Sequence, residues 1–230
     1  MSPIRAIHFD FDGVLADTEP LHFQMFQEVL QGEGVTLLKE DYYARYLGLD
    51  DASCFQQVFT DRGLTLDVPQ RDRLIQSKNQ KVLKALASRN FLMPGVPELL
   101  KVLHEKYYLT VVSGALKSEV NKALQGGGVE TCFRLVIGAE DVKQCKPDPE
   151  GYLLALKLLN RDHVPAADIL LPHECAIVED SPWGIQSARG AGMPCIGVTH
   201  SYPRDHLKDA TRVIDSLSEI TPDLLAALST

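Results

Sequence analysis

The sequence predicts an α/β fold, a Rossmann-like three-layer core built on a parallel sheet, with an inserted helical cap domain. Short apolar runs typical of buried strands alternate with amphipathic helical patterns, and this alternation favours a parallel sheet covered on both faces. The alternation stops between about residues 21 and 88, where no run is typical of a strand. We therefore expect a discontinuous core, residues 1–17 and 89–230, and a helical cap, residues 18–88.

The expected strands are short apolar segments, most of them followed by a polar or glycine-containing turn. Continuous apolar strands of this kind are typical of a sheet that is buried on both faces. In chain order the expected strands are Ile4–Phe9, Tyr108–Val112, Leu135–Ile137, Cys175–Val178, Cys195–Val198 and Arg212–Ile214.

Helical patterns lie between these strands. Leu116, Val120 and Leu124 repeat every four residues, which is the spacing of one helix face. Two further helices are expected to begin with a capping residue followed by Pro at the first helical position, at Asp148–Pro149 and at Ser181–Pro182.

The composition limits the classes of partner and compartment. The net charge of -8 argues against nucleic acid and against an anionic membrane, because both bind basic patches. The five cysteines have no CxxC spacing, which favours reduced thiols. The N-terminal residues do not resemble a signal peptide, and no apolar run approaches the length of a membrane span. We expect a cytoplasmic monomer.

Two carboxylates, Asp10 and Asp12, follow the first strand and precede a glycine. In an extended chain, residues i and i+2 point to the same side. Two carboxylates at such a short separation repel each other, unless a proton or a divalent cation compensates their negative charge. The alternative is an ordinary turn rich in Asp and Gly.

Polar residues also follow other strands, and the carboxyl ends of parallel strands share one edge of the sheet. Oxygen ligands on loops suit Mg²⁺. A lysine and a helix beginning after Gly114 suit a phosphate group. The residues expected to meet at this edge are Asp10 and Asp12, Ser113 and Gly114, Lys146, and Glu179 and Asp180.

Four motifs in this order resemble those of the haloacid dehalogenase superfamily, over nearly the whole chain. The resemblance is to the branch with a helical cap after the first strand, which holds phosphoglycolate phosphatase-like and β-phosphoglucomutase-like enzymes. The matching segments are residues 10–18 (DFDGVLADT), 112–114 (VSG), 146–149 (KPDP) and 178–181 (VEDS).

The resemblance implies roles for the core residues. Asp10 is the expected nucleophile, which takes the phosphoryl group as an aspartyl-phosphate. Asp12 is the expected general acid and base. Mg²⁺ is expected on Asp10, the backbone carbonyl of Asp12, and Asp180, with help from Glu179. Ser113 and the Gly114 amide are expected to hold phosphate oxygens, and Lys146 to bridge Asp10 and the phosphate.

The resemblance says less about the cap. A His at the position of His22 contacts either the substrate or the acid/base Asp in relatives, and an ordinary surface His is the alternative. Lys78 could reach a second phosphate. Asp17 and Thr18 are assigned to the hinge and turn, and Trp183 receives no function.

The leading hypothesis is a Mg²⁺-dependent phosphatase that hydrolyses a small phosphorylated metabolite, a sugar phosphate. A sugar-phosphate mutase of the β-phosphoglucomutase type shares every core residue. Mutase relatives, however, place an Arg after a Gly in the cap, where this chain has Asp50 and Asp51. The third hypothesis is a non-catalytic module that binds a phosphorylated metabolite.

Overall fold

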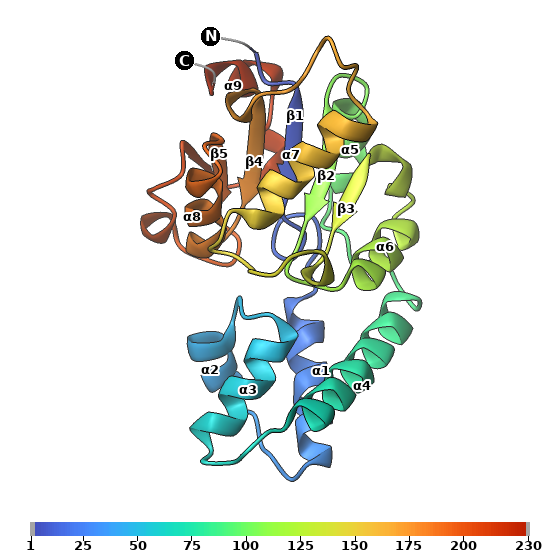
Figure 1. Ribbon diagram of the computed structural model, residues 1–230, viewed down its shortest axis with the longest axis vertical. Coiled ribbons are helices and arrows are strands. Elements are labelled where there is room, and N and C mark those ends of the chain that lie inside the picture. The colour runs from blue at the N-terminus through green and yellow to red at the C-terminus, as the bar shows by residue number, and fades with distance from the viewer. Residues whose placement is uncertain (1–2, 229–230) are drawn as a thin grey trace.

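The computed structural model describes residues 3–228 and contains one six-stranded parallel sheet with the strand order β3-β2-β1-β4-β5-β6 (Figure 1). Each expected strand forms, so the predicted sheet is confirmed. The strands are β1 (Ala6–Phe9), β2 (Tyr108–Val112), β3 (Leu135–Ile137), β4 (Cys175–Glu179), β5 (Cys195–Val198) and β6 (Arg212–Ile214).

The register of the sheet brings the expected site residues to one edge. Strand β1 lies between β2 and β4, with Phe9 opposite both Val111 and Val178. The amide of Asp10 then donates to the carbonyl of Val178 at 2.9 Å. The residues that follow β1, β2 and β4 therefore lie beside one another, where open α/β sheets hold their ligands.

Helices cover both faces of the sheet and produce the predicted three layers. One buried cluster joins α7 and α8 to one face of the sheet, and the other joins α5, α6 and α9 to the opposite face. Along β1 the side chains alternate, with Ala6 in the first cluster and Ile7 in the second. The helices are α5 (Val96–Leu103), α6 (Lys117–Gly126), α7 (Glu150–Asp162), α8 (Pro182–Gly190) and α9 (Pro222–Ala227).

Short helical turns complete the core. They are η2 (Glu130–Cys132), η3 (Ala139–Asp141), η4 (Pro172–Glu174), η5 (Arg204–His206) and η6 (Leu217–Glu219).

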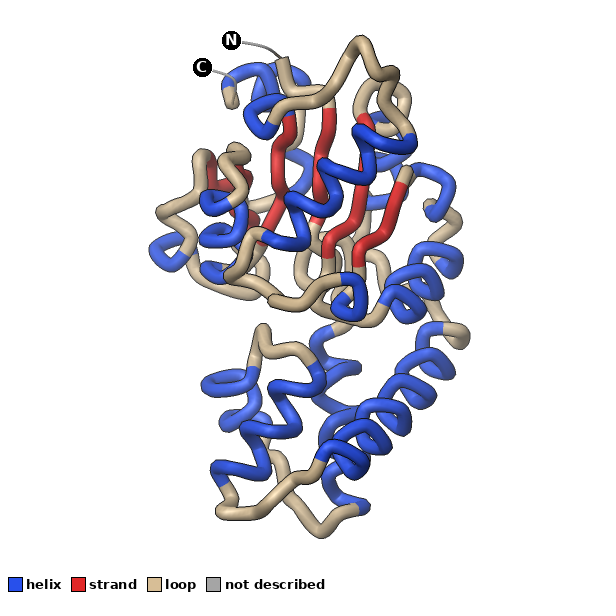
Figure 2. Tube along the Cα trace, in the orientation of Figure 1, coloured by secondary structure: helices blue, strands red, loops and turns tan. Residues whose placement is uncertain are grey.

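The helices between β1 and α5 form a separate lobe beyond the carboxyl edge of the sheet (Figures 1 and 2). The lobe has its own apolar core, in which Phe26 of α1 packs against Phe55 of α3. Its elements are α1 (Glu19–Gly32), α2 (Lys39–Asp41), η1 (Tyr42–Tyr46), α3 (Asp51–Asp61) and α4 (Val68–Leu86). We refer to residues 18–88 as the cap, and these limits stay our proposal.

Two segments, residues 15–17 and 91–93, link the cap to the sheet, and backbone hydrogen bonds join them to each other. The amide of Asp17 donates to the carbonyl of Phe91, and that of Met93 donates to the carbonyl of Leu15, both at 3.0 Å. Ala16 and Leu92 form an antiparallel bridge between these bonds. The entry and the exit of the cap are therefore a short paired ribbon.

One helix start differs from the expected position. Helix α6 begins after Gly114 as expected, at Lys117, and Gly114 lies in the loop before it. Helix α7 begins at Glu150 with Pro149 as its capping residue, because the Asp148 carboxylate accepts from the Glu150 amide at 2.9 Å. The expected start of α8 is confirmed: the Ser181 hydroxyl accepts from the Gly184 amide.

Within residues 3–228, no helix is both long and apolar enough to span a bilayer. All five cysteines fall in this range and are free thiols.

Candidate active site

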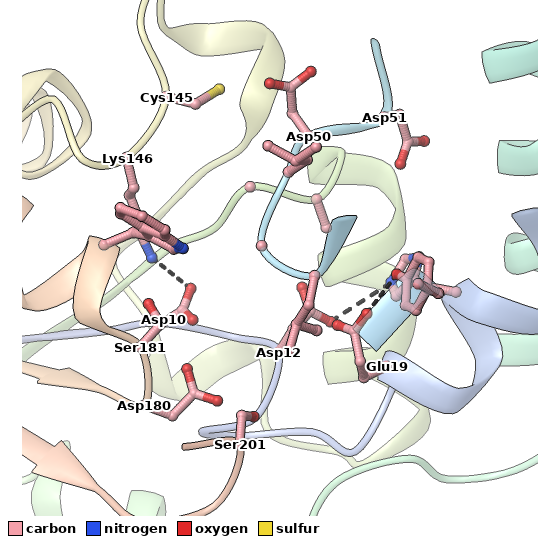
Figure 3. A pocket seen from close by; sticks show the side chains of 18 of the residues that line it. Asp10, Asp12, Glu19, Asp50, Asp51, Cys145, Lys146, Asp180, Ser181 and Ser201 are labelled. Atoms are coloured by element: carbon pink, nitrogen blue, oxygen red, sulfur yellow. Dashed lines mark hydrogen bonds and ion pairs between the residues drawn. The ribbon is translucent and has the colours of Figure 1, made fainter. Parts of the chain in front are cut away.

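Lys146 and Asp10 form the centre of the site (Figure 3). The Lys146 ammonium group lies 2.6 Å from Asp10 Oδ1, 2.6 Å from Glu179 Oε1 and 3.1 Å from the carbonyl oxygen of Val112. Burial alone would lower the pKa of Lys146, but the two carboxylates outweigh it and raise that pKa. Lys146 is therefore a fixed positive charge beside the expected nucleophile.

Asp10, Glu179 and Asp180 form a cluster that could bind a metal ion, with one carboxylate oxygen from each lying within 4.8 Å of the others. Burial, followed by repulsion from Glu179, raises the pKa of Asp180 to about 7. Burial also raises the pKa of Asp10, against the opposing effect of Lys146. Carboxylates held this close retain protons unless a cation compensates, so the donor set fits a hard divalent cation.

Two glycines allow the chain to pack tightly against this cluster. Gly13 has a φ of 77°, and a Cβ atom there would lie 1.9 Å from Asp180 Oδ2. A Cβ atom at Gly184 would lie 1.8 Å from the carboxyl carbon of Glu179. No larger residue fits at either position without displacing a carboxylate of the cluster.

Glu179 is fully buried and is held from several directions. The Tyr152 hydroxyl donates to Oε1 at 2.7 Å, and the Ser181 hydroxyl donates to Oε2 at 3.1 Å. With the Lys146 contact at Oε1, both oxygens of Glu179 have partners. Its carboxylate is therefore fixed in orientation toward the cluster.

The Asp12 side chain belongs to a different set of contacts. The Thr18 hydroxyl donates to Asp12 Oδ1, and His22 Nε2 lies 3.6 Å from the same oxygen. Burial raises the pKa of Asp12, but the hydrogen bonds from His22 and Thr18 outweigh it, so this pKa lies below its ordinary value. Metal ligation through the Asp12 backbone carbonyl stays a prediction.

Lys78 holds His22 in one tautomer. Its ammonium group lies 2.9 Å from His22 Nδ1, and because a charged lysine only donates, Nδ1 must accept. The imidazole proton is then on Nε2, which faces Asp12. The cap side chain His22 can therefore donate to the expected acid/base carboxylate.

Lys78 does not line the pocket. Its side chain is 1% exposed, its ammonium group lies 2.5 Å from Asp51 Oδ1, and it packs over the ring of Phe26. From the sequence, Lys78 was a residue that could reach a second phosphate. The structure instead connects Lys78 to the pocket through Asp51 and His22.

Ser113 and Gly114, the expected phosphate-binding residues, lie in the loop that follows β2. The Ser113 hydroxyl accepts from the Ala115 amide at 3.0 Å and lies 3.4 Å from Asp12 Oδ2. Gly114 lines the pocket, and a Cβ atom there would meet no protein atom within 4 Å. The space above Gly114 is open to a ligand.

The pocket lies between the core and the cap and has a volume of about 120 Å³. Its lining includes residues that the sequence analysis did not assign to the site, of which the clearest is Trp183. This side chain is 47% exposed, and its ring lies 3.2 Å from where a Cβ atom of Gly48 would be. The other unassigned lining residues are Phe26, Glu19, Tyr42, residues 47–49, Ala115, Cys145, Ser181, Ser201 and Tyr202.

The sequence contains one indication that Trp183 lies near the site. Trp183 follows the Ser181–Pro182 helix start directly, so it occupies the first turn of α8 at the same edge as the acidic motif. The cap residues gave no such signal, because their approach to the core depends on how the two parts pack.

Comparisons with known proteins identify the family of this chain. The family model for haloacid dehalogenase-like hydrolases matches residues 7–198. A phosphorylated carbohydrates phosphatase from Thermotoga maritima is 30% identical over 200 residues, which cover 86% of this chain and 87% of that protein.

Solved structures have the same fold. A β-phosphoglucomutase from Clostridium difficile has a TM-score of 0.85 at 21% identity, over 98% of this chain and 97% of that one. CbbY from Rhodobacter sphaeroides, solved with xylulose 1,5-bisphosphate, has a TM-score of 0.81 at 25% identity, over 94% of this chain and 96% of that one. The match of the family model spans most of the sequence and includes all four motifs. The chain belongs to the haloacid dehalogenase-like hydrolases.

Proposed function

We propose that this protein is a Mg²⁺-dependent phosphatase that hydrolyses a small phosphorylated metabolite, a sugar phosphate, through an aspartyl-phosphate intermediate. The observation that carries the proposal is the position of Asp10, which lies 2.6 Å from the Lys146 ammonium group and within the carboxylate cluster. The name of the Thermotoga maritima relative, a phosphorylated carbohydrates phosphatase, is consistent with this substrate class.

In the first step, an oxygen of Asp10 attacks the phosphorus atom and a bond forms between them. The bond from phosphorus to the ester oxygen breaks, and its electron pair leaves with that oxygen. Asp12, in its protonated form, donates a proton to the leaving oxygen. Lys146 stabilises the negative charge that spreads over the phosphoryl oxygens.

In the second step, Asp12 takes a proton from a water molecule, and the resulting hydroxide attacks the phosphorus atom. The bond between phosphorus and Asp10 breaks, inorganic phosphate is released, and the Asp10 carboxylate is restored. The low pKa of Asp12 suits this basic role. The negative charge of an incoming phosphate ester raises that pKa and favours the acidic form for the first step.

Asp10, Glu179 and Asp180 would hold Mg²⁺, which neutralises charge between the nucleophilic carboxylate and the phosphate ester when it is bound. The backbone amide of Gly114 and the Ser113 hydroxyl would hold phosphate oxygens. The cap would act as a lid that excludes bulk water from the intermediate.

The direct test uses Asp10→Asn, which keeps the size of the side chain and removes the nucleophilic oxygen. We expect release of inorganic phosphate from a panel of phosphate esters with Mg²⁺ to fall to background, while the circular dichroism spectrum stays unchanged. Activity near that of the wild type would exclude the aspartyl-phosphate mechanism.

A mutase would use the same core residues and needs a site for a second phosphate. The cap offers Asp50 and Asp51 to the pocket, and the nearby Lys78 is buried in contacts with Asp51 and His22. These carboxylates favour the phosphatase. Conversion of β-glucose 1-phosphate to glucose 6-phosphate in the presence of a bisphosphate primer, without release of phosphate, would reverse this choice.

A further inference from the structure

The two ends of the pocket differ in charge. Lys146 serves the phosphate end, where it contacts Asp10 and Glu179. Among the described residues that line the pocket, no other Lys or Arg is present. The cap side contributes carboxylates instead, from Glu19, Asp50 and Asp51. Figure 3 shows Asp50 and Asp51 across the pocket from Asp10 and Asp180.

The nearest cap cation, Lys78, is paired with Asp51, which leaves Asp50 and Glu19 without an ion pair among residues 3–228. The Lys78 ammonium group is enclosed by Asp51, His22 and the ring of Phe26. An anion in the pocket therefore meets the carboxylates of the cap without direct access to the lysine. Like charges that meet at a partly dehydrated surface disfavour binding strongly.

Asp51 also has a free acceptor. Its Oδ1 is occupied by Lys78, whereas its Oδ2 is a buried atom with no hydrogen-bond partner among residues 3–228. Buried polar atoms are costly unless they are paired, so this oxygen favours a ligand that brings a donor. A hydroxyl group supplies a donor without adding negative charge.

Aromatic side chains complete this end of the pocket. Trp183 from α8 is half-exposed at the lining, and Tyr202 lies there as well. A flat ring can cover the apolar C–H face of a polyol while its hydroxyl groups bond to neighbouring acceptors. The combination of acceptors and rings suits a hydroxylated, uncharged group.

We propose that the cap side of the pocket selects phosphate monoesters whose leaving group is an uncharged polyol, and that Asp50 and Asp51 exclude esters with a second anionic group. Asp51 accepts a hydrogen bond from a hydroxyl of the leaving group, and Trp183 covers its apolar face. This selectivity rests on the proposed phosphatase activity. It deepens that proposal by excluding carboxylated esters and bisphosphates of otherwise similar shape.

The test compares pairs of esters that differ in one anionic group. The pairs are glycerol 3-phosphate with 3-phosphoglycerate, glucose 6-phosphate with 6-phosphogluconate, and fructose 6-phosphate with fructose 1,6-bisphosphate. We expect kcat/KM for the uncharged leaving group to exceed that for its anionic partner by about tenfold or more in the pairs that are hydrolysed. If kcat/KM is equal for the two esters of a pair, or higher for the anionic ester, the proposed selectivity is wrong, while the proposed phosphatase activity is unaffected. Absence of turnover with every ester overturns both proposals.

The variant that isolates the charge is Asp50→Asn. Asp50 caps α3 by accepting from the Ser53 amide at 2.9 Å, and Asn caps helices about as well as Asp, so the fold is retained. We expect the ratio of kcat/KM for the uncharged ester to kcat/KM for its anionic partner to fall by about threefold or more in this variant. The main cause should be a lower KM for the anionic esters. Asp51→Asn, which also removes the negative partner of Lys78, should lower this ratio further.

The matched control is Asp72→Asn. Asp72 lies on α4 of the cap, its side chain is 61% exposed, and it does not line the pocket. The change in net charge is the same, so the preference should stay at the wild-type value. The assignment of the selectivity to Asp50 and Asp51 is wrong if the ratio of kcat/KM values falls as much in Asp72→Asn as in their variants. It is also wrong if the ratio stays unchanged in both Asp50→Asn and Asp51→Asn.

Discussion

Lys146 and Asp10 are separated by 136 residues in the chain, yet their charged groups lie 2.6 Å apart. Lys146 also contacts Glu179 at 2.6 Å, so one ammonium group joins the ends of two neighbouring strands, β1 and β4. This arrangement gives the buried carboxylates a partner before any ligand arrives. The first prediction concerns what happens when that partner is removed.

Lys146→Ala should lower kcat by about 10²- to 10³-fold, because the charge that develops on the phosphoryl oxygens loses a positioned donor. Steady-state release of phosphate measures the effect. Lys143→Ala is the control, since Lys143 is exposed and does not line the pocket. An unchanged kcat in Lys146→Ala would remove this lysine from the mechanism.

Removal of the metal should abolish turnover, and its addition should stabilise the fold. The cluster of Asp10, Glu179 and Asp180 holds repelling carboxylates that a divalent cation neutralises. A ligand that binds only the folded state raises the melting temperature. Thermal scans with EDTA and with millimolar Mg²⁺ should therefore differ. In Asp180→Asn the difference should shrink, and a full-size shift in this variant would place the metal elsewhere.

Gly13→Ala should inactivate the enzyme, and Gly63→Ala should not. Both glycines have positive φ, of 77° and 68°, so either substitution costs about 1–2 kcal/mol of backbone strain. Only at Gly13 does the new Cβ atom collide with Asp180, because nothing lies within 4 Å at Gly63. Urea unfolding and phosphate release, measured on both variants, separate strain from the collision. Equal activities would show that the contact with Asp180 is unimportant.

His8 should make the fold sensitive to acid. This fully buried side chain bonds through Nδ1 to the Thr110 hydroxyl at 2.5 Å, and no partner within residues 3–228 bonds to Nε2. Burial lowers its pKa from 6.5 to about 4, so the folded protein disfavours the proton that the unfolded chain accepts. The free energy of unfolding should therefore fall as the pH drops from about 6.5 toward 4, by about 2 kcal/mol at pH 5.

Urea unfolding of His8→Asn at several pH values checks this prediction. The variant can keep the bond to Thr110 but has no group to protonate, so its stability should change less between pH 7 and pH 5. His163→Asn, an exposed control, should follow the wild type. The idea fails if the wild type and His8→Asn lose stability in parallel.

The core of the site could be predicted because it depends on local patterns and on one rule of sheet geometry. The apolar runs determine the strands, and parallel strands bring their carboxyl ends together, so Asp10, Lys146 and Glu179 meet as expected. The start of α7 was expected one residue too early because apolar spacing does not define where a helix begins, and Glu150 rather than Pro149 is its first residue.

The cap side of the pocket could not be predicted in the same way. Lys78 was a candidate for contact with a second phosphate, but Asp51 and His22 approach it from other cap helices and enclose it. Trp183 lines the pocket because the cap loop at Gly48 packs against it. Such contacts depend on how separate units pack together, which hydrophobic periodicity does not encode.

The paired ribbon at the base of the cap has a mechanical consequence. The Met93 amide donates a hydrogen bond to the Leu15 carbonyl, and the Asp17 amide donates one to the Phe91 carbonyl. The backbone therefore enters and leaves the cap through one two-stranded hinge rather than through two independent connections. If the cap swings about this hinge, His22, Lys78 and Asp51, which contact one another within the cap, would move away from Asp12 together. Under the proposed mechanism, product release by such a swing would separate His22 from Asp12 in every catalytic cycle.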